Sequence, residues 1–363
     1  MADKTAHGLF DARTERGWTP AELARLRRQG EDTLSLIPSR VRARKVPSMA
    51  TSQSRWPDAA YVWTWLHAER EPVVAGAVEQ HGALMHFVYA NSYLARDNAI
   101  SLCSPELPLR SGVIEPLGGL NQAGAIRDGS PGAWGRSVIR YRLHLGEDDI
   151  TELGYMLESG TNRFGANDFQ ASPTEYVPRS ESTPLGQLAE AATRAEAGLD
   201  SSDAMAQALL HRTTFGGARP KVLVHDTEDG SEWIAKLSST SDRVFSVVNA
   251  EAACFELARR AGIRVPVSKV TTIADRSGLL VSRFDRPSGG GRRHVVSGLT
   301  IVGLAETHAR YATYPALLEK LRELGSDPVG AGTELFERIA FSIAIGNMTT
   351  MRATTVHSGM AST

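Results

Sequence analysis

The sequence predicts an α+β fold with two β-rich segments, and three observations lead to this prediction. An early group of apolar, partly alternating stretches has turn residues between its members, which is typical of antiparallel strands. A second group of such stretches comes later and surrounds a helix-like segment. Beyond it, apolar side chains recur at helical spacing along residues 334–346. The strand-like stretches are 60–66, 72–76, 83–89, 221–225, 231–237 and 279–284.

The composition is that of an ordinary globular protein, with 42% hydrophobic and 22% charged residues in a chain of 363. The formal net charge of −1 gives no general attraction to nucleic acids or membranes. Cys103 and Cys254 lie at no zinc-ligand or CxxC spacing. The sequence has no signal peptide and no apolar run of the ~18 residues that a membrane span needs. Low cysteine use suits a reducing compartment, so we expect a cytoplasmic protein.

Residues 1–48 form a basic extension, with ten Lys and Arg against six Asp and Glu. A short helix is favoured after Thr19, since Thr is a good N-cap and Pro20 suits a first helical turn. The segment carries too few apolar residues for a core, so we expect a disordered extension. The alternatives are an arm that binds nucleic acid or a partner, and translation that starts at Met49 rather than Met1.

Residues 58–115 are expected to form the first β-rich unit. Beyond it, residues 128–136 should form a loop that enters a helix from Ser137 to Leu145. The glycines of 119–124 and 160–165 suggest phosphate loops, but both segments lack the Lys-Ser/Thr pair that such a loop requires. The later stretch 185–211 is expected to be connecting helices.

A nucleotide-binding pattern begins at Gly216 and Gly217. Adjacent glycines let a backbone turn approach phosphate oxygens closely, with its N–H groups directed inward. The following strand pair contains Lys236 among apolar residues. A lysine there must pair with an acid or face a cavity, because an unpaired buried charge is costly. Glu251, on the inward side of the next helix, is the expected partner.

The strand at 279–284 is expected to link this segment to the later part of the chain. Its backbone after Val281 would offer adenine an N–H and a C=O, and Asp285 would bind a ribose hydroxyl. Each feature is a weak signal alone. The order of glycine turn, lysine strand, acidic helix and linking strand is nevertheless that of the nucleotide-holding half of a kinase.

Seven short motifs between Trp56 and Asn347 carry a more specific signal. They are Tyr93-Leu94-Ala95-Arg96, Ala133-Trp134-Gly135-Arg136, Leu157-Glu158-Ser159-Gly160, Gly216-Gly217-Ala218-Arg219-Pro220-Lys221, Ile234-Ala235-Lys236, Val281-Ser282-Arg283-Phe284-Asp285-Arg286 and Leu335-Phe336-Glu337-Arg338. Together they resemble the HipA family of toxin kinases. The resemblance implies a two-lobed kinase-like fold that uses ATP and Mg²⁺. It also implies phosphorylation of serine or threonine in a translation protein such as an aminoacyl-tRNA synthetase, and control by a helix-turn-helix antitoxin that provides the contact with DNA.

The resemblance also implies domains and site residues. The family's autophosphorylated loop serine is matched by Thr214, with Thr213 as the neighbouring candidate. Gly132 and Asn162 depart from the family, which often carries an acidic residue at the first position and Asp at the second. The implied cofactor-binding residues are Gly216, Gly217, Ala218, Lys236, Glu251, Arg283, Phe284 and Asp285. The implied domains are an N-terminal subdomain at 56–150, a nucleotide-binding lobe at 151–286 and the start of a helical lobe at 287–347.

The resemblance ends at Asn347. In the family, Gly-Asn is followed by the catalytic loop Thr-Asp-Asp-His-x-Arg-Asn-His, whose Asp acts on the attacking hydroxyl and whose Asn binds Mg²⁺. Residues 348–363 form an out-of-family tail that contains no Asp or Glu. We therefore identify no catalytic residue and no metal ligand, and we expect a chain that is inactive or nearly so as a kinase but still binds nucleotide weakly.

The genetic code offers an explanation for the tail. Codons for Met348 to Thr363 can be chosen that, read after their first two letters are dropped, give Asp-Asp-His-Ala-Arg-Asn-His-Gly-Ala-Phe-Trp-Asp-Gly-Lys-His. The first Asp is forced by Met348 and Thr349. This predicts a one-nucleotide deletion just after Asn347, a helical lobe that is largely missing, and apolar surface exposed on 299–304 and 314–324.

Three other interpretations remain open. The first is a natural shortened relative with an unrelated tail. The second is a non-catalytic protein that binds an antitoxin or a substrate. The third is a small-molecule kinase of related fold.

Overall fold

The computed structural model describes residues 55–67, 69–179, 221–226, 230–238, 246–273, 276–287, 290–347 and 355–357. The basic extension, the stretch 185–211 and the glycine turn with Thr213 and Thr214 lie outside these ranges. The sequence-based expectations for them therefore stay predictions.

The first unit is an antiparallel sheet with the strand order β4-β3-β2-β1-β5. Its first three strands confirm the strands predicted before residue 90. Side chains from both faces of the sheet belong to one apolar core, which contains Val62, Phe87 and Phe169. The elements are β1 (Ala59–Thr64), β2 (Val73–His81), β3 (Leu84–Tyr89), α3 (Asn91–Leu94), β4 (Val113–Ile114), α4 (Gly124–Asp128), α5 (Ala133–Leu143), α6 (Glu152–Glu158) and β5 (Asn167–Gln170).

Two predicted boundaries in this unit are wrong. Helix α5 begins at Ala133, not at Ser137, because the extended Gly132 already serves as its N-cap; it ends where His144 takes a left-handed φ of 53°. The unit also continues past residue 150. Strand β5 pairs with β1, and Leu153 and Met156 lie in the same core. Residues 151–179 thus belong to the first unit and not to the nucleotide-binding lobe.

The second sheet has the order β6-β7-β9-β8 and is antiparallel throughout. Its strands are β6 (Lys221–His225), β7 (Glu232–Leu237), β8 (Ser268–Ile273) and β9 (Arg276–Ser282). Helix α9 (Val247–Arg260) buries Val248 against Leu279 and Val281 of β9. The predicted strands and helix are confirmed, and the chain turns just after the helix at Gly262, whose φ is 82°. Strand β8 was not predicted.

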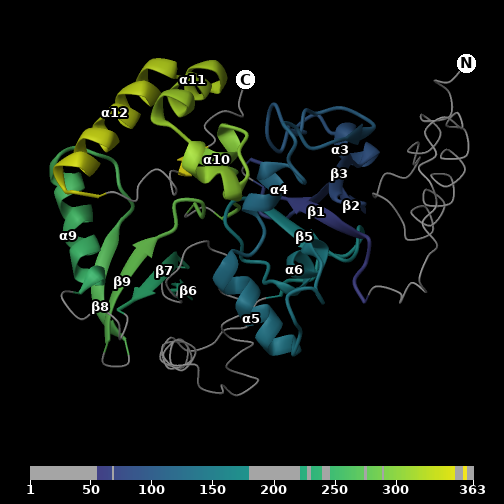
Figure 1. Cartoon of the computed structure of the whole chain (residues 1–363), viewed down its shortest axis with the longest axis horizontal. Coiled ribbons are helices and arrows are strands. Elements are labelled where there is room, and N and C mark those ends of the chain that lie inside the picture. The colour runs from purple at the N-terminus through teal and green to yellow at the C-terminus, as the bar shows by residue number, and fades with distance from the viewer. Residues whose placement is uncertain are drawn as a thin grey trace, which may run out of the picture.

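Helices make up most of the remaining described chain. They are α10 (Gly298–Ile301), the 3-10 helix η2 (Glu306–Tyr311), α11 (Tyr314–Leu324) and α12 (Pro328–Ala344). A short strand, β10 (Val295–Ser297), pairs with β11 (Thr355–His357). Figure 1 shows the two sheets at opposite sides of the molecule, with α11 and α12 near α9 and the second sheet. No helix among the described residues is long and apolar enough to cross a membrane.

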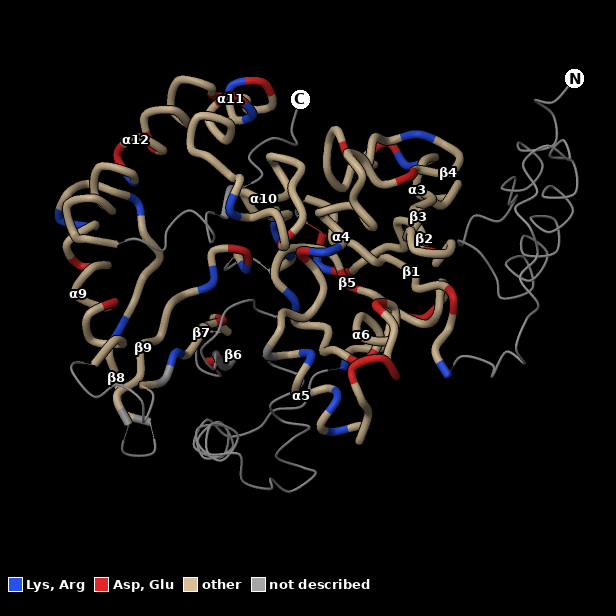
Figure 2. The backbone as a smooth tube through the Cα atoms, viewed as in Figure 1, with Lys and Arg blue, Asp and Glu red and all other residues tan. Residues whose placement is uncertain are grey.

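Helix α12 differs from its prediction in length and in burial. It begins at Pro328, where the Asp327 side chain accepts a hydrogen bond from the Gly330 N–H. Leu335 is buried, whereas Phe336 and Ile343 are 70% and 75% exposed, so the expected apolar face is split. Most of α12 is tan in Figure 2, which means that few of its residues are Lys, Arg, Asp or Glu.

The predicted exposure on 299–304 and 314–324 is not what the structure shows. The large apolar side chains of α11 that face inward, Leu317 and Leu321, are buried with Leu335. The exposed apolar surface lies instead on α12, where Val329 adds to Phe336 and Ile343 at seven-residue spacing. Seven residues are close to two helical turns, so these three side chains share one face of the helix.

Candidate functional site

Lys236 and Glu251 form the predicted ion pair. Lys236 lies near the end of β7, and its Nζ contacts Oε1 of Glu251 on α9. The two side chains remain 25% and 33% exposed. The lysine Nζ also lies 5.9 Å from the ring centroid of Phe255. A lysine that is held by an acid yet still open to solvent can offer its charge to an anionic ligand.

An apolar surface adjoins this pair. The register places Leu223, Ile234 and Val281 side by side across β6, β7 and β9. Ile234 is two residues from Lys236, so alternation puts both side chains on the same face of the sheet. Leu223 and Val281 are buried. Val281 packs against Val248 of α9, so of the three only Ile234 keeps exposure beside the lysine, where a planar base linked to phosphates could contact it. Sequence periodicity singled out none of the three residues, because only the strand register brings them together.

Arg283 and Asp285 lie in a buried ion-pair network instead of an open site. Arg283 Nη2 donates to Asp285 Oδ2 at 2.6 Å, and Arg286 Nη1 donates to the same oxygen at 2.9 Å. The Gly165 N–H also donates to it, at 2.9 Å. Burial raises the pKa of Asp285, but the charges of Arg286 and Arg283 and these hydrogen bonds outweigh it and bring the pKa below its usual value. All of these contacts of Asp285 are made within the protein. The predicted contact between Asp285 and a ribose hydroxyl stays a prediction.

Phe284 is also engaged within the protein. Its ring packs edge-to-face on Phe164, with 5.6 Å between the centroids. Its carbonyl oxygen accepts a hydrogen bond of 3.1 Å from Nη1 of Arg293. Of the cofactor-binding residues implied by the resemblance, the structure thus brings Lys236 and Glu251 together and groups Arg283 with Asp285. Gly216, Gly217 and Ala218 lie outside the described residues.

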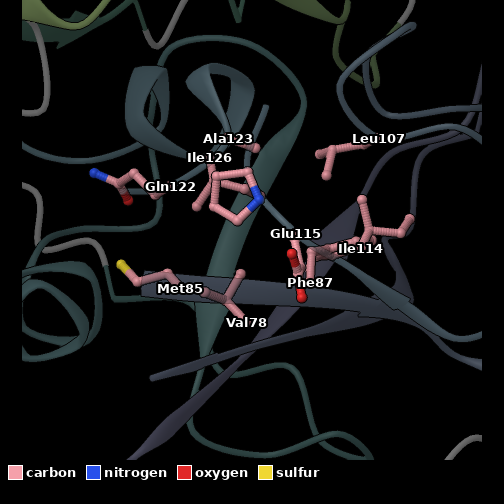
Figure 3. Close-up of a pocket in the computed structure, with 10 residues that line it drawn as sticks. Val78, Met85, Phe87, Leu107, Ile114, Glu115, Gln122, Ala123 and Ile126 are labelled. Atoms are coloured by element: carbon pink, nitrogen blue, oxygen red, sulfur yellow. The ribbon is translucent and has the colours of Figure 1, made fainter. Parts of the chain in front are cut away.

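A hollow lies in the first unit, between its strands and α4 (Figure 3). Val78 and Met85 come from the strands, and Ile126 from α4. Its polar lining includes Gln122, whose Oε1 is buried without a hydrogen-bond partner among the described residues. The hollow is small and mostly apolar, and no set of converging polar groups marks it as a ligand site.

Metal binding finds no support in this part of the chain. Within the described residues, no group of three or more His, Cys, Asp and Glu side chains could hold a metal ion. Mg²⁺ can also be held by one or two carboxylates together with phosphate oxygens, so this observation does not decide Mg²⁺ binding and no chemical step is assigned to that ion.

A half-buried histidine joins the first unit to the chain beyond β9. His294 Nε2 lies 3.0 Å from the Trp65 carbonyl oxygen and 3.3 Å from Thr64 Oγ1. Because a carbonyl oxygen only accepts, the neutral ring must carry its proton on Nε2. Burial lowers the pKa of His294 to about 4. The imidazole is therefore neutral at physiological pH.

This histidine predicts acid-sensitive stability. An unfolded histidine has a pKa of about 6.5, so between that value and 4 the unfolded chain takes up a proton that the folded chain does not. The full shift corresponds to about 3 kcal/mol, and since the residue keeps some exposure we expect the free energy of unfolding to fall by ~2 kcal/mol from pH 7 to pH 4. In urea unfolding curves, His294→Gln should flatten this dependence while the exposed control His308→Gln should not. Equal slopes for both variants and the wild type would contradict it.

Comparison with known proteins identifies the second half of the chain. Residues 213–349 match the family model of the HipA-like C-terminal domain. The match contains the second sheet, the Lys236–Glu251 pair and α10 to α12. This part of the chain is therefore similar to the C-terminal domain of the HipA family. No curated protein matches the chain.

A solved structure shows the same fold. It is the complex of HipA and HipB of the Shewanella oneidensis MR-1 toxin–antitoxin system with its operator DNA. The match covers 79% of this chain and 70% of that one, with a TM-score of 0.54 and 16% identity. At this identity the comparison supports the predicted α+β, kinase-like fold.

Proposed function

We propose that this chain is a HipA family member that binds ATP on the face of the second sheet that carries Lys236. The observation that carries the proposal is the Lys236–Glu251 pair beside Leu223, Ile234 and Val281. The lysine would contact phosphate oxygens, and Glu251 would hold its ammonium group in place. Ile234, which keeps some exposure beside the lysine, would contact the adenine. Gly216, Gly217 and Ala218 would close over the phosphates, with Thr214 as the candidate autophosphorylation site.

We propose further that the 363-residue chain transfers phosphate poorly. Residues 348–363 contain no Asp or Glu, and the described residues hold no cluster that fits a metal ion. The family chemistry, phosphorylation of serine or threonine in a translation protein, would need such groups. The second candidate is a non-catalytic protein that engages an antitoxin or a substrate, and the carboxylate-free tail favours it.

A helix-turn-helix antitoxin is the proposed partner. The similar structure is a complex of HipA with HipB and operator DNA, which supports a HipB-like protein. DNA would be contacted through that antitoxin, because this chain has a formal net charge of only −1. We place this assembly in the cytoplasm.

Nucleotide binding is tested by replacing the lysine. Lys236→Ala should weaken ATP binding by roughly 10- to 100-fold, since a charge-assisted hydrogen bond contributes about 1.5–3 kcal/mol. The matched control is Lys269→Ala. Lys269 lies on β8 with its Nζ 4.5 Å from the ring centroid of Trp233, and its register places it on the other face of the sheet. Isothermal titration calorimetry that gave equal affinities for the two variants would contradict the proposed site.

A further inference from the structure

A short segment of the first unit, residues 161–165, contacts the ends of two strands in the second sheet. Gly165 N–H donates to Asp285 Oδ2, and the Arg163 carbonyl oxygen accepts from Arg283 Nη2 at 2.7 Å. These contacts join parts of the chain about 120 residues apart. Charged residues of both signs gather where the two units meet in Figure 2.

Asn162 occupies the centre of these contacts. Its Nδ2 donates to Glu232 Oε2 at 2.6 Å, and its Oδ1 accepts from Arg283 Nη1 at 2.6 Å and from Arg286 Nη2 at 3.0 Å. Glu232 is the first residue of β7, and Arg283 follows the last residue of β9. The Arg283 N–H also donates to the Glu232 carbonyl oxygen at 2.9 Å. One amide side chain therefore bridges the two strands.

The segment that carries Asn162 is firmly held by the first unit. The Arg163 side chain is fully buried, and its Nε donates to Asp168 Oδ1 at 2.6 Å. Its Nη1 donates to the Gly129 carbonyl oxygen at 2.7 Å. Gly165 has a φ of 80°, which favours glycine there. Asn162 is thus presented to the second sheet from a fixed backbone.

The two bridged strands are those that form the proposed ATP site. Strand β7 carries Lys236 four residues after Glu232, on the same face of the sheet. Strand β9 carries Val281 two residues before Arg283. If Glu232 moved relative to Arg283, β7 would shift relative to β9. Lys236 would then move relative to Val281.

We propose that Asn162 is a positioning residue through which the N-terminal unit sets the geometry of the nucleotide site. This inference rests on the proposed ATP binding. The amide is suited to the position because it donates to a carboxylate and accepts from two guanidinium groups at once. An aspartate would accept from both arginines but would oppose the Glu232 carboxylate at hydrogen-bond distance, and like charges that close repel.

The test exchanges the amide and the carboxylate of the Asn162–Glu232 pair. Asn162→Asp should weaken ATP binding by roughly tenfold, the effect of about 1.4 kcal/mol. The double variant Asn162→Asp with Glu232→Gln restores a donor opposite the new carboxylate and leaves the net charge of the chain unchanged. It should bring the affinity back to within about twofold of the wild type. Asn98→Ala, at an exposed asparagine of the same unit, should leave the affinity unchanged.

Two readouts separate positioning from a general loss of stability. Calorimetric ATP affinity is measured beside the thermal midpoint, and hydrogen exchange is followed in residues 232–237 and 279–286. Positioning predicts faster exchange in both strands for Asn162→Asp and recovery in the double variant. Unchanged affinity for Asn162→Asp, or no recovery in the double variant, overturns the inference alone. A wild-type chain that bound no ATP would overturn the proposed function as well.

Discussion

Insertion of one nucleotide into codon 348 is expected to raise phosphate transfer by the chain, because it would supply the catalytic loop that the resemblance implies. Met348 has a single codon, ATG, and a C inserted after its first letter gives ACT, a threonine codon. The remaining G joins the AC that begins the Thr349 codon to give GAC, the first aspartate codon, as in the family loop. A positioned carboxylate that acts on the attacking hydroxyl contributes roughly 10²–10⁴-fold to a rate. Phosphate transfer from ATP should rise by at least that factor, since metal ligands would be supplied with it. The assay is incorporation of radioactive phosphate into the chain or a translation factor.

The controls for this experiment use the site already described. Lys236→Ala in the frame-restored chain should remove the new activity, which excludes a contaminating kinase. Equal activity in the 363-residue chain and the restored chain would contradict the assignment of catalysis to residues beyond Asn347. The natural nucleotide sequence after codon 347 tests the origin of the tail, because the deletion hypothesis requires the aspartate codons in the second frame.

Much of the candidate nucleotide site could be predicted because its signals are local. Lys236 follows three apolar residues in its strand, and Glu251 falls on the inward face of the next helix, so periodicity and the cost of unpaired burial sufficed to pair them. The apolar surface beside them could not be predicted. Leu223, Ile234 and Val281 become neighbours only through the register of three strands, which the sequence does not fix.

Residues at the junction were the least predictable. Asn162 looked like a minor departure from the family, yet it bridges Glu232 and two arginines. Asp285 was assigned to a ribose because of its position at a strand end, while its neighbours in space come from a loop about 120 residues earlier. Contacts of this kind depend on how two units pack, and hydrophobic periodicity reports only which face of each element is buried.

Loss of Asp285 is expected to produce the largest change in stability. Its carboxylate is 1% exposed and lies between Arg283 and Arg286, so Asp285→Ala removes the nearest anion of two buried guanidinium groups and leaves Arg283 only Glu232, at 3.6 Å. Removing one partner of a buried ion pair costs about 3–5 kcal/mol. Urea unfolding should show this loss, with a smaller one for Asp285→Asn, whose amide oxygen can still accept from Gly165. The control is Glu323→Ala, at an exposed partner of Lys320, which should change stability by less than ~1 kcal/mol.

Acid adds a second test of the same carboxylate. Because the folded pKa of Asp285 lies below its usual value, its contribution is complete above the unfolded pKa of about 3.9 and is lost as the pH falls through the folded pKa. The wild type should therefore lose stability below about pH 4 more steeply than Asp285→Asn, which has no proton to take up there. This range lies below the one in which His294 acts, so the two groups are separable in one titration. Parallel acid unfolding curves for the wild type and Asp285→Asn would show that the buried arginines do not depend on this anion.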